Sequence, residues 1–102
     1  MYYTYLLRCG DGSLYAGITT DPQRRLAEHR AGGKKGARYT RSRAPLSFEA
    51  VWESENRSSA SKLEARLKAA KRDVKERLAA RPDLLEQFIP LPEGAAYKPV
   101  GC

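Results

Sequence analysis

The chain has 102 residues, of which 41% are hydrophobic and 30% are charged. This length suits one small domain without room for two independent cores, and the apolar fraction is too high for a wholly disordered chain. The apolar runs fall far short of the ~20 residues that cross a bilayer, and no secretory leader precedes the aromatic residues from Tyr2 onward. Cys9 and Cys102 are too few for a disulfide framework and lack partners at zinc-ligand spacing. We therefore expect a soluble, cytoplasmic protein without membrane contact.

The positive charge is concentrated in one segment. The chain carries 19 Lys+Arg against 12 Asp+Glu, a formal net charge of +7. Between Arg24 and Arg43, eight basic residues are opposed only by Glu28, so this segment accounts for the whole excess. Interspersed glycines and a tyrosine suit a groove that follows phosphates and stacks a base, whereas the alternative is a cationic surface kept for solubility. The predicted nucleic-acid-binding residues are Arg24, Arg30, Lys34, Lys35, Arg38, Tyr39, Arg41 and Arg43.

The first predicted elements are two strands joined by a turn. Residues 2–9 and 14–19 are rich in aromatic and β-branched side chains, and a glycine-containing turn separates them. A hairpin centred on residue 10 or 11 pairs odd-numbered positions with odd-numbered positions. Tyr5 is then expected opposite Tyr15 or Gly17, on the same side of the sheet.

A short helix is predicted after the hairpin. Asp21 suits the N-cap and Pro22 the first helical position, and the helix is expected to run to about Arg30 and stop near Gly32. Arg25 and His29 are four residues apart, so the helix would place them on one face.

The second half of the chain predicts one more strand and further helices. Residues 46–52 suit a third strand, and apolar residues at steps of three and four from Leu63 to Leu78 predict one long helix or two, with a break near residues 72–73. Ser58 to Ser61 offer N-caps, a short helix is expected over 83–89, and the segment from Pro90 is expected to be loosely held. The predicted fold is α/β (α+β), a three-stranded antiparallel sheet flanked by helices. We divide it into a domain over 1–80 and a short helix and tail over 81–102.

Several motifs occur in a fixed order along this pattern. They are Tyr3-Thr4-Tyr5, Tyr15-Ala16-Gly17, Arg25, His29, the loop KKGARYTR, and Glu64 within EARLK. On these motifs the chain resembles the GIY-YIG nuclease superfamily, in particular its small stand-alone bacterial members, over roughly residues 2–78. Two departures stand out: the first motif lacks its glycine and isoleucine, and Ile18 follows Gly17 where some relatives carry a lysine or another polar residue.

The resemblance implies a single compact GIY-YIG-type domain and a metal-dependent DNA endonuclease. It implies that Tyr5 takes a proton from the attacking water and that Tyr15 orders the water or the phosphate. Arg25 would bind the scissile phosphate, and His29 would contact the phosphate or protonate the leaving oxygen. Glu64 would bind Mg²⁺ or Mn²⁺.

The chain is too short for a second domain that would select a substrate. Selectivity would then come from the basic loop of residues 30–43, which favours single-stranded or branched DNA. No obligate protein partner is expected.

Each candidate residue also has a purely structural interpretation. Tyr5 and Tyr15 suit the edge of a core, and Arg25 and His29 suit a helix surface. Glu64 could complete a capping box with Ser61 or form an i,i+4 ion pair with Lys68. Two other functions follow from such interpretations: a nucleic-acid-binding module without catalysis, for DNA or RNA, or a small basic structural or toxin-like protein.

Overall fold

A computed structural model describes residues 1–10, 12–31 and 45–100, with the side chains of residues 30, 31, 45 and 46 excepted. The strands are β1 (Tyr2–Cys9), β2 (Leu14–Thr19), β3 (Pro45–Ser54) and β4 (Lys98–Pro99). The helices are α1 (Pro22–Ala31), α3 (Arg57–Ala69), α4 (Arg72–Ala80), the 3₁₀ turn η1 (Pro82–Leu84) and α5 (Leu85–Phe88). The predicted nucleic-acid residues Lys34, Lys35, Arg38, Tyr39, Arg41 and Arg43 lie outside the described residues.

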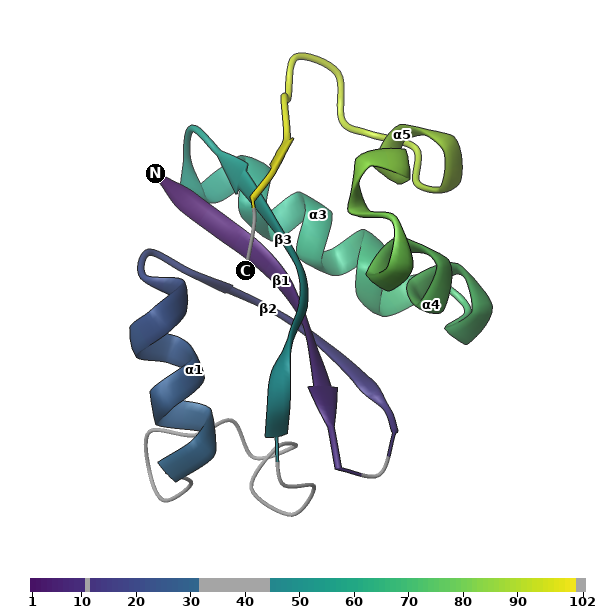
Figure 1. Cartoon of the computed structure of the whole chain (residues 1–102). Helices are drawn as coiled ribbons and strands as arrows, with labels where there is room; N and C mark the ends of the chain where they lie inside the picture. The colour runs from purple at the N-terminus through teal and green to yellow at the C-terminus, as the bar shows by residue number, and fades with distance from the viewer. Residues whose placement is uncertain (11, 32–44, 101–102) are drawn as a thin grey trace.

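The sheet is antiparallel, with the strand order β2-β1-β3-β4 (Figure 1). In the hairpin Tyr5 pairs with Gly17, which confirms the predicted register. The predicted count of three strands is wrong, because Trp52 and Glu53 of β3 pair with Pro99 and Lys98 of β4. This two-residue strand has no alternating pattern to identify it in a proline-rich segment. Its partner β3 is ten residues long and offers unpaired backbone groups along that edge.

Helices cover both faces of the sheet (Figure 1). On one face, Leu6 and Trp52 belong to a buried cluster with Leu63 and Leu67 of α3 and Leu78 of α4. On the other face, a smaller cluster built on the β1 residues Tyr5 and Leu7 contacts Leu26 of α1. The expected α+β architecture, a sheet flanked by helices, is therefore confirmed.

The helix ends follow the local chemistry of the chain. Asp21 caps α1 as predicted, since its Oδ1 accepts a hydrogen bond from the Arg24 amide at 3.2 Å. In α3 the cap is Asn56, whose Oδ1 accepts from the Ser59 amide at 2.8 Å, so this helix begins earlier than the predicted serine caps. The helical pattern that follows is split into two helices, with the break at residues 70–71.

The segment after residue 80 packs on the same core as α3 and α4. The indole Nε1 of Trp52 donates to the Pro82 carbonyl at 2.9 Å, and Leu85 and Ile89 are buried. The Tyr97 hydroxyl donates to the Ser59 carbonyl of α3 at 2.6 Å. Within the described part of the chain, no helix is long and apolar enough to span a bilayer.

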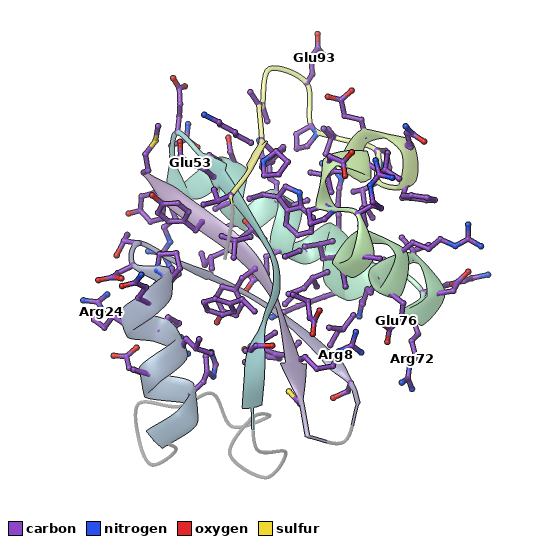
Figure 2. The ribbon with its side chains drawn as sticks, viewed as in Figure 1. Arg8, Arg24, Glu53, Arg72, Glu76 and Glu93 are labelled. Carbon is purple, nitrogen blue, oxygen red and sulfur yellow. The ribbon has the colours of Figure 1, made fainter. Side chains whose placement is uncertain are left out.

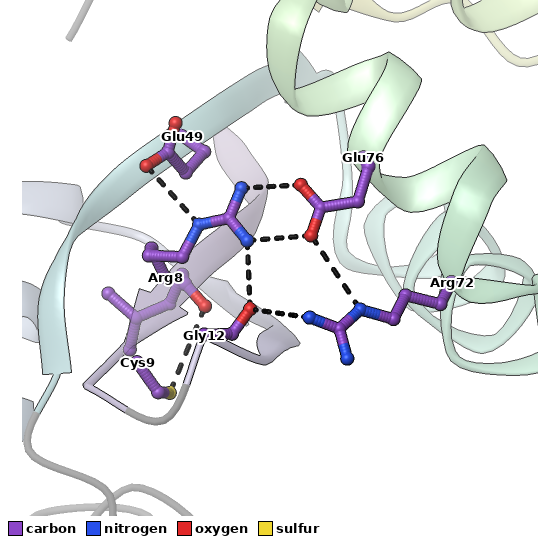
Figure 3. Close-up of polar contacts among 7 residues, drawn as sticks. Arg8, Cys9, Gly12, Glu49, Arg72 and Glu76 are labelled. Atoms are coloured by element: carbon purple, nitrogen blue, oxygen red, sulfur yellow. Dashed lines mark hydrogen bonds and ion pairs between the residues drawn. The ribbon is translucent and has the colours of Figure 1, made fainter.

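An ion-pair cluster joins the β1–β2 hairpin to α4 (Figures 2 and 3). Arg8 makes a two-pronged contact with Glu76, at 2.7 and 2.6 Å, and also donates to the Gly12 carbonyl at 2.9 Å. Glu49 of β3 lies 3.5 Å from Arg8, and Arg72 lies 3.8 Å from Glu76. We call Arg8, Glu49, Arg72 and Glu76 the hairpin clasp.

Candidate active site

Tyr5 lies at the centre of a group of polar side chains on the α1 side of the sheet. Only 1% of the residue is exposed, and its hydroxyl lies 2.8 Å from Nε2 of His29. Its strand partner Gly17 has no side chain, and a Cβ there would overlap the Tyr5 hydroxyl. The glycine is therefore required for Tyr5 to adopt this position.

His29 comes from α1, one turn after Arg25, and is fully buried. Its ring contacts Tyr5 and Tyr15 edge-on, with 5.8 Å between ring centroids in each case. Phe48 of β3 packs on Tyr5 from another side at 4.7 Å. The contact of His29 with a phosphate or the leaving oxygen stays a prediction.

Arg25 shares a face of α1 with His29, as predicted. Its guanidinium lies within hydrogen-bonding reach of the Tyr5 hydroxyl, and its Nη1 pairs with Glu28 at 3.2 Å. The Arg25 side chain is 25% exposed. A planar cation in this place can receive a phosphate oxygen next to Tyr5.

Glu64 and Tyr15 complete the group from α3 and β2. Both lie close enough to Tyr5 that their negative charges would raise its pKa. Glu64 pairs with Lys68 at 3.6 Å, and the Lys68 ammonium lies 5.7 Å from the centre of the Tyr15 ring. The position of α3 is fixed near this point because the Thr4 hydroxyl donates to the Ala60 carbonyl at 3.0 Å.

Burial controls the protonation of the central pair. It raises the pKa of Tyr5 to about 12, although Arg25 acts in the opposite direction. Burial, together with the positive charge of Arg25, lowers the pKa of His29 to about 4. Both groups are therefore neutral at pH 7, and the direction of the hydrogen bond between them is set by the tautomer of His29.

One structural interpretation of Glu64 is excluded by the start of α3. A capping box needs the serine at the N-cap, but Asn56 occupies the N-cap and Ser61 lies inside the helix. The other interpretation, the ion pair with Lys68, is observed.

The donor set at Glu64 decides which kind of metal site the described residues can form. Among residues 1–10, 12–31 and 45–100, no three histidine, cysteine or acidic side chains gather as a metal cluster. A structural zinc or calcium site is thus not formed by these residues. One partly exposed carboxylate fits a magnesium-type ion, which keeps several waters and takes its remaining ligands from substrate phosphates.

The structure thus brings Tyr5, Tyr15, Arg25, His29 and Glu64 to one place, although they come from four different elements. Of the predicted nucleic-acid residues that are described, Arg24 is exposed on α1 and its side chain points away from the sheet (Figure 2). Arg30 is described only as backbone in α1. Lys68 and Phe48 were not among the sequence candidates. The sequence indicates Lys68 only as the i,i+4 ion-pair partner of Glu64, and no sequence feature indicates that Phe48 packs on Tyr5.

Comparison with known proteins adds an independent line of evidence. The family model described as the GIY-YIG catalytic domain matches residues 1–77. The UPF0213 protein VNG_2274C of Halobacterium salinarum is 44% identical over 78 residues, which cover 76% of this chain and 99% of that protein. A UPF0213 protein of Streptococcus sanguinis is 48% identical over 73 residues, which cover 72% of this chain and 82% of that protein.

A solved structure is also similar in sequence. The UPF0213 protein BH0048 from Bacillus halodurans, determined by solution NMR, is 41% identical, and the match covers 78% of this chain and 84% of that one with a TM-score of 0.49. The family-model match spans the described site from Tyr5 to Glu64. On this match and the identities to its relatives, the chain belongs to the GIY-YIG nuclease family.

Proposed function

We propose that this protein is a metal-dependent DNA endonuclease that hydrolyses phosphodiester bonds in single-stranded or branched DNA. The observation that carries the proposal is the 2.8 Å contact between the Tyr5 hydroxyl and Nε2 of His29, beside the partly exposed side chain of Arg25. A structural tyrosine needs a hydrogen-bond partner, but it does not need a neutral histidine on one side and an arginine on the other.

Tyr5 and His29 together form a path for a proton. A phenol with a pKa of about 12 cannot be ionised in advance at neutral pH, so it accepts a proton only if it releases its own. In the proposed step, a proton of the attacking water moves to the Tyr5 oxygen while the Tyr5 proton moves to Nε2 of His29. The water oxygen forms a bond to phosphorus while the bond to the 3′ oxygen breaks, and the 3′ oxygen leaves with that electron pair and takes a proton from solvent.

Arg25 assists this transfer in two ways. Its forked guanidinium binds a phosphate oxygen and offsets the charge that grows in the transition state. In the free protein its positive charge also opposes protonation of His29. A bound phosphate partly neutralises that charge, so the imidazole accepts a proton more readily when the substrate is present.

Glu64 would hold the divalent cation, Mg²⁺ or Mn²⁺. When bound, such a cation supplies positive charge next to the phosphate and to the leaving oxygen. Tyr15 lies against the His29 ring and close to Tyr5, where we expect it to order the attacking water or the phosphate.

The proposal is tested with a Tyr5→Phe variant. Phenylalanine keeps the ring that packs on Phe48 but removes the hydroxyl, so cleavage should fall by about 10²- to 10⁴-fold while DNA binding is retained. Tyr3→Phe is the matched control, because Tyr3 is a less buried tyrosine of the same strand that lines a pocket with Asp21, Pro22 and Val100. Wild-type cleavage in Tyr5→Phe would contradict the proposal.

The substrate is tested with a panel of single-stranded, duplex, forked and four-way DNA, with RNA controls. Each is incubated with Mg²⁺ or Mn²⁺ and then with a chelator. Metal-dependent cleavage that is faster on single-stranded or branched DNA supports the proposal. Saturable binding without cleavage of any substrate would instead identify a binding module.

A further inference from the structure

Lys68 occupies the solvent side of the candidate site. Its ammonium lies 3.6 Å from Oε2 of Glu64 and 5.7 Å from the centre of the Tyr15 ring. About half of the side chain is exposed (51%), against 24% for Glu64. Lys68 is therefore the more exposed member of the ion pair, and Glu64 is partly exposed beside it.

Stability does not account for this arrangement. An exposed i,i+4 ion pair contributes little to a folded protein, because solvent screens it and two long side chains must be held in one geometry. The Tyr15 ring adds a second attraction, because a cation within about 6 Å of an aromatic face is drawn to it. Two separate groups thus hold the ammonium at the rim of the site.

The ion pair also conflicts with the role proposed for Glu64. A divalent cation on this carboxylate would be next to the ammonium, and the two positive charges would repel each other. A lysine head group on a flexible four-carbon stem can move away at low cost. The nearest favourable destination is a negative phosphate, which the proposed function brings to the same place.

We propose that Lys68 is a phosphate-binding residue of this site that exchanges partners. In the free protein its ammonium pairs with Glu64, and in the complex it pairs with a phosphate oxygen of the nucleic acid while Glu64 takes the divalent cation. This inference rests on the proposed function, since it assigns the metal to Glu64. It adds a substrate contact and a competition between Lys68 and the metal for one carboxylate.

The competition is tested without nucleic acid. Mn²⁺ affinity is measured by water-proton relaxation for the wild type, Lys68→Gln and Lys62→Gln, with thermal melting to confirm folding. Lys62 is the matched control, because it is an exposed lysine of the same helix about 240° around the axis from Lys68. Lys68→Gln should bind Mn²⁺ about 1.4- to 5-fold more tightly, the range expected for loss of an exposed competing ion pair.

The phosphate contact is tested in a Tyr5→Phe background, so that the DNA is not consumed. With Mg²⁺ held constant, adding Lys68→Gln should weaken DNA binding and lower the slope of log K against log salt by about 0.7 to 0.9, the value for one phosphate contact. Adding Lys62→Gln should leave that slope unchanged.

The outcomes separate this inference from the function on which it rests. If Lys68→Gln matches Lys62→Gln in both Mn²⁺ affinity and salt slope, Lys68 is a surface partner of Glu64 and the inference is overturned, while the nuclease proposal stands. Glu64→Gln should itself weaken Mn²⁺ binding. If it does not, the metal assignment fails and both proposals fall together.

Discussion

The hydrogen bond between Tyr5 and His29 connects two residues whose pKa values are shifted in opposite directions by burial. The phenol becomes harder to deprotonate and the imidazole harder to protonate, so each remains neutral over a wide range of pH. Neutral groups can be buried at modest cost when they satisfy each other, which is the situation in this pair. In the proposed step, Nε2 of His29 accepts the proton of Tyr5.

The low pKa of His29 predicts a particular dependence of stability on pH. Between about pH 6.5 and pH 4 the unfolded state binds a proton that the folded state does not, so the stabilising contribution is complete above pH 6.5 and is lost as the pH falls to 4. At ~1.4 kcal/mol per pKa unit, the loss is about 3 kcal/mol at most. Urea unfolding at pH 7.5 and at pH 4 should show this loss in the wild type and a smaller loss in His29→Gln. Equal losses in the two proteins would contradict the burial of a neutral histidine.

The positions of individual residues could be predicted from the sequence where they depend on neighbours a few positions away in the chain. The turn fixes the hairpin register and hence the pairing of Tyr5 with Gly17, and a spacing of four puts Arg25 and His29 on one helix face. The burial of His29 could not be predicted. It depends on how α1 docks on the aromatic residues of the sheet, which are distant in the sequence.

Among the secondary-structure elements, α4 shows how a contact distant from the site can hold the sheet in place. The hairpin clasp ties the β1–β2 turn to α4 through the two-pronged contact between Arg8 and Glu76 (Figure 3). The same hairpin carries Tyr5 and Tyr15 further along its strands. Loss of the hairpin clasp should therefore destabilise the β1–β2 hairpin more than it destabilises α1.

A Glu76→Gln variant tests the clasp. The hydrogen bonds from Arg8 hold the pKa of Glu76 below its ordinary value, so the carboxylate stabilises the fold above about pH 4.5 and this contribution is lost as the pH falls through the lowered pKa. We expect a loss of about 1 kcal/mol at pH 7, because both partners are partly exposed. Glu86→Gln, an exposed carboxylate of α5, is the control. If denaturant unfolding gives the two variants the same free energy of unfolding, the hairpin clasp does not stabilise the fold.

The observed helices and strands differ from the prediction at two places where the spacing of apolar residues does not indicate the structure: the break between α3 and α4, and the strand β4. Apolar spacing runs through α3 and α4 without interruption, so it cannot locate the break at residues 70–71. The β4 strand has two residues and is formed by pairing with β3, not by its own composition. Long amphipathic elements could be predicted, whereas short elements depend on contacts that only the folded chain supplies.

For the molecule as a whole, we propose that the basic segment and the candidate site have different roles. The basic segment between α1 and β3 joins the helix that carries Arg25 and His29 to the strand that carries Phe48. Its charge supplies an attraction for phosphates that does not depend on base sequence. We therefore assign affinity to this segment and chemistry to the residues around Tyr5.

Replacing Lys34, Lys35 and Arg38 with alanine tests this division of roles. DNA binding should weaken, and its salt dependence should become less steep. With fewer phosphate contacts, fewer counterions are released from the DNA on binding. Turnover at saturating DNA should change much less. Alanine at Arg57, Lys62 and Lys98, three exposed cations elsewhere, is the charge-matched control. An unchanged salt slope in the first variant would show that the basic segment does not bind the substrate.

The central claim is that Glu64 takes part in metal-dependent catalysis and is more than the partner of Lys68. Glutamine at this position keeps the size and helix propensity of the side chain but removes the negative charge that a hard cation needs. Loss of the ion pair alone should cost about 0.5 kcal/mol or less.

The most direct measurement is a Mg²⁺ titration of DNA cleavage by the wild type and by Glu64→Gln, with thermal melts of both proteins. Glu93→Gln, an exposed carboxylate in the loop before β4, serves as the control (Figure 2). We expect the melting temperature and DNA binding of Glu64→Gln to stay near the wild-type values, while cleavage is absent at every Mg²⁺ concentration. Wild-type cleavage by the folded Glu64→Gln protein would contradict the account.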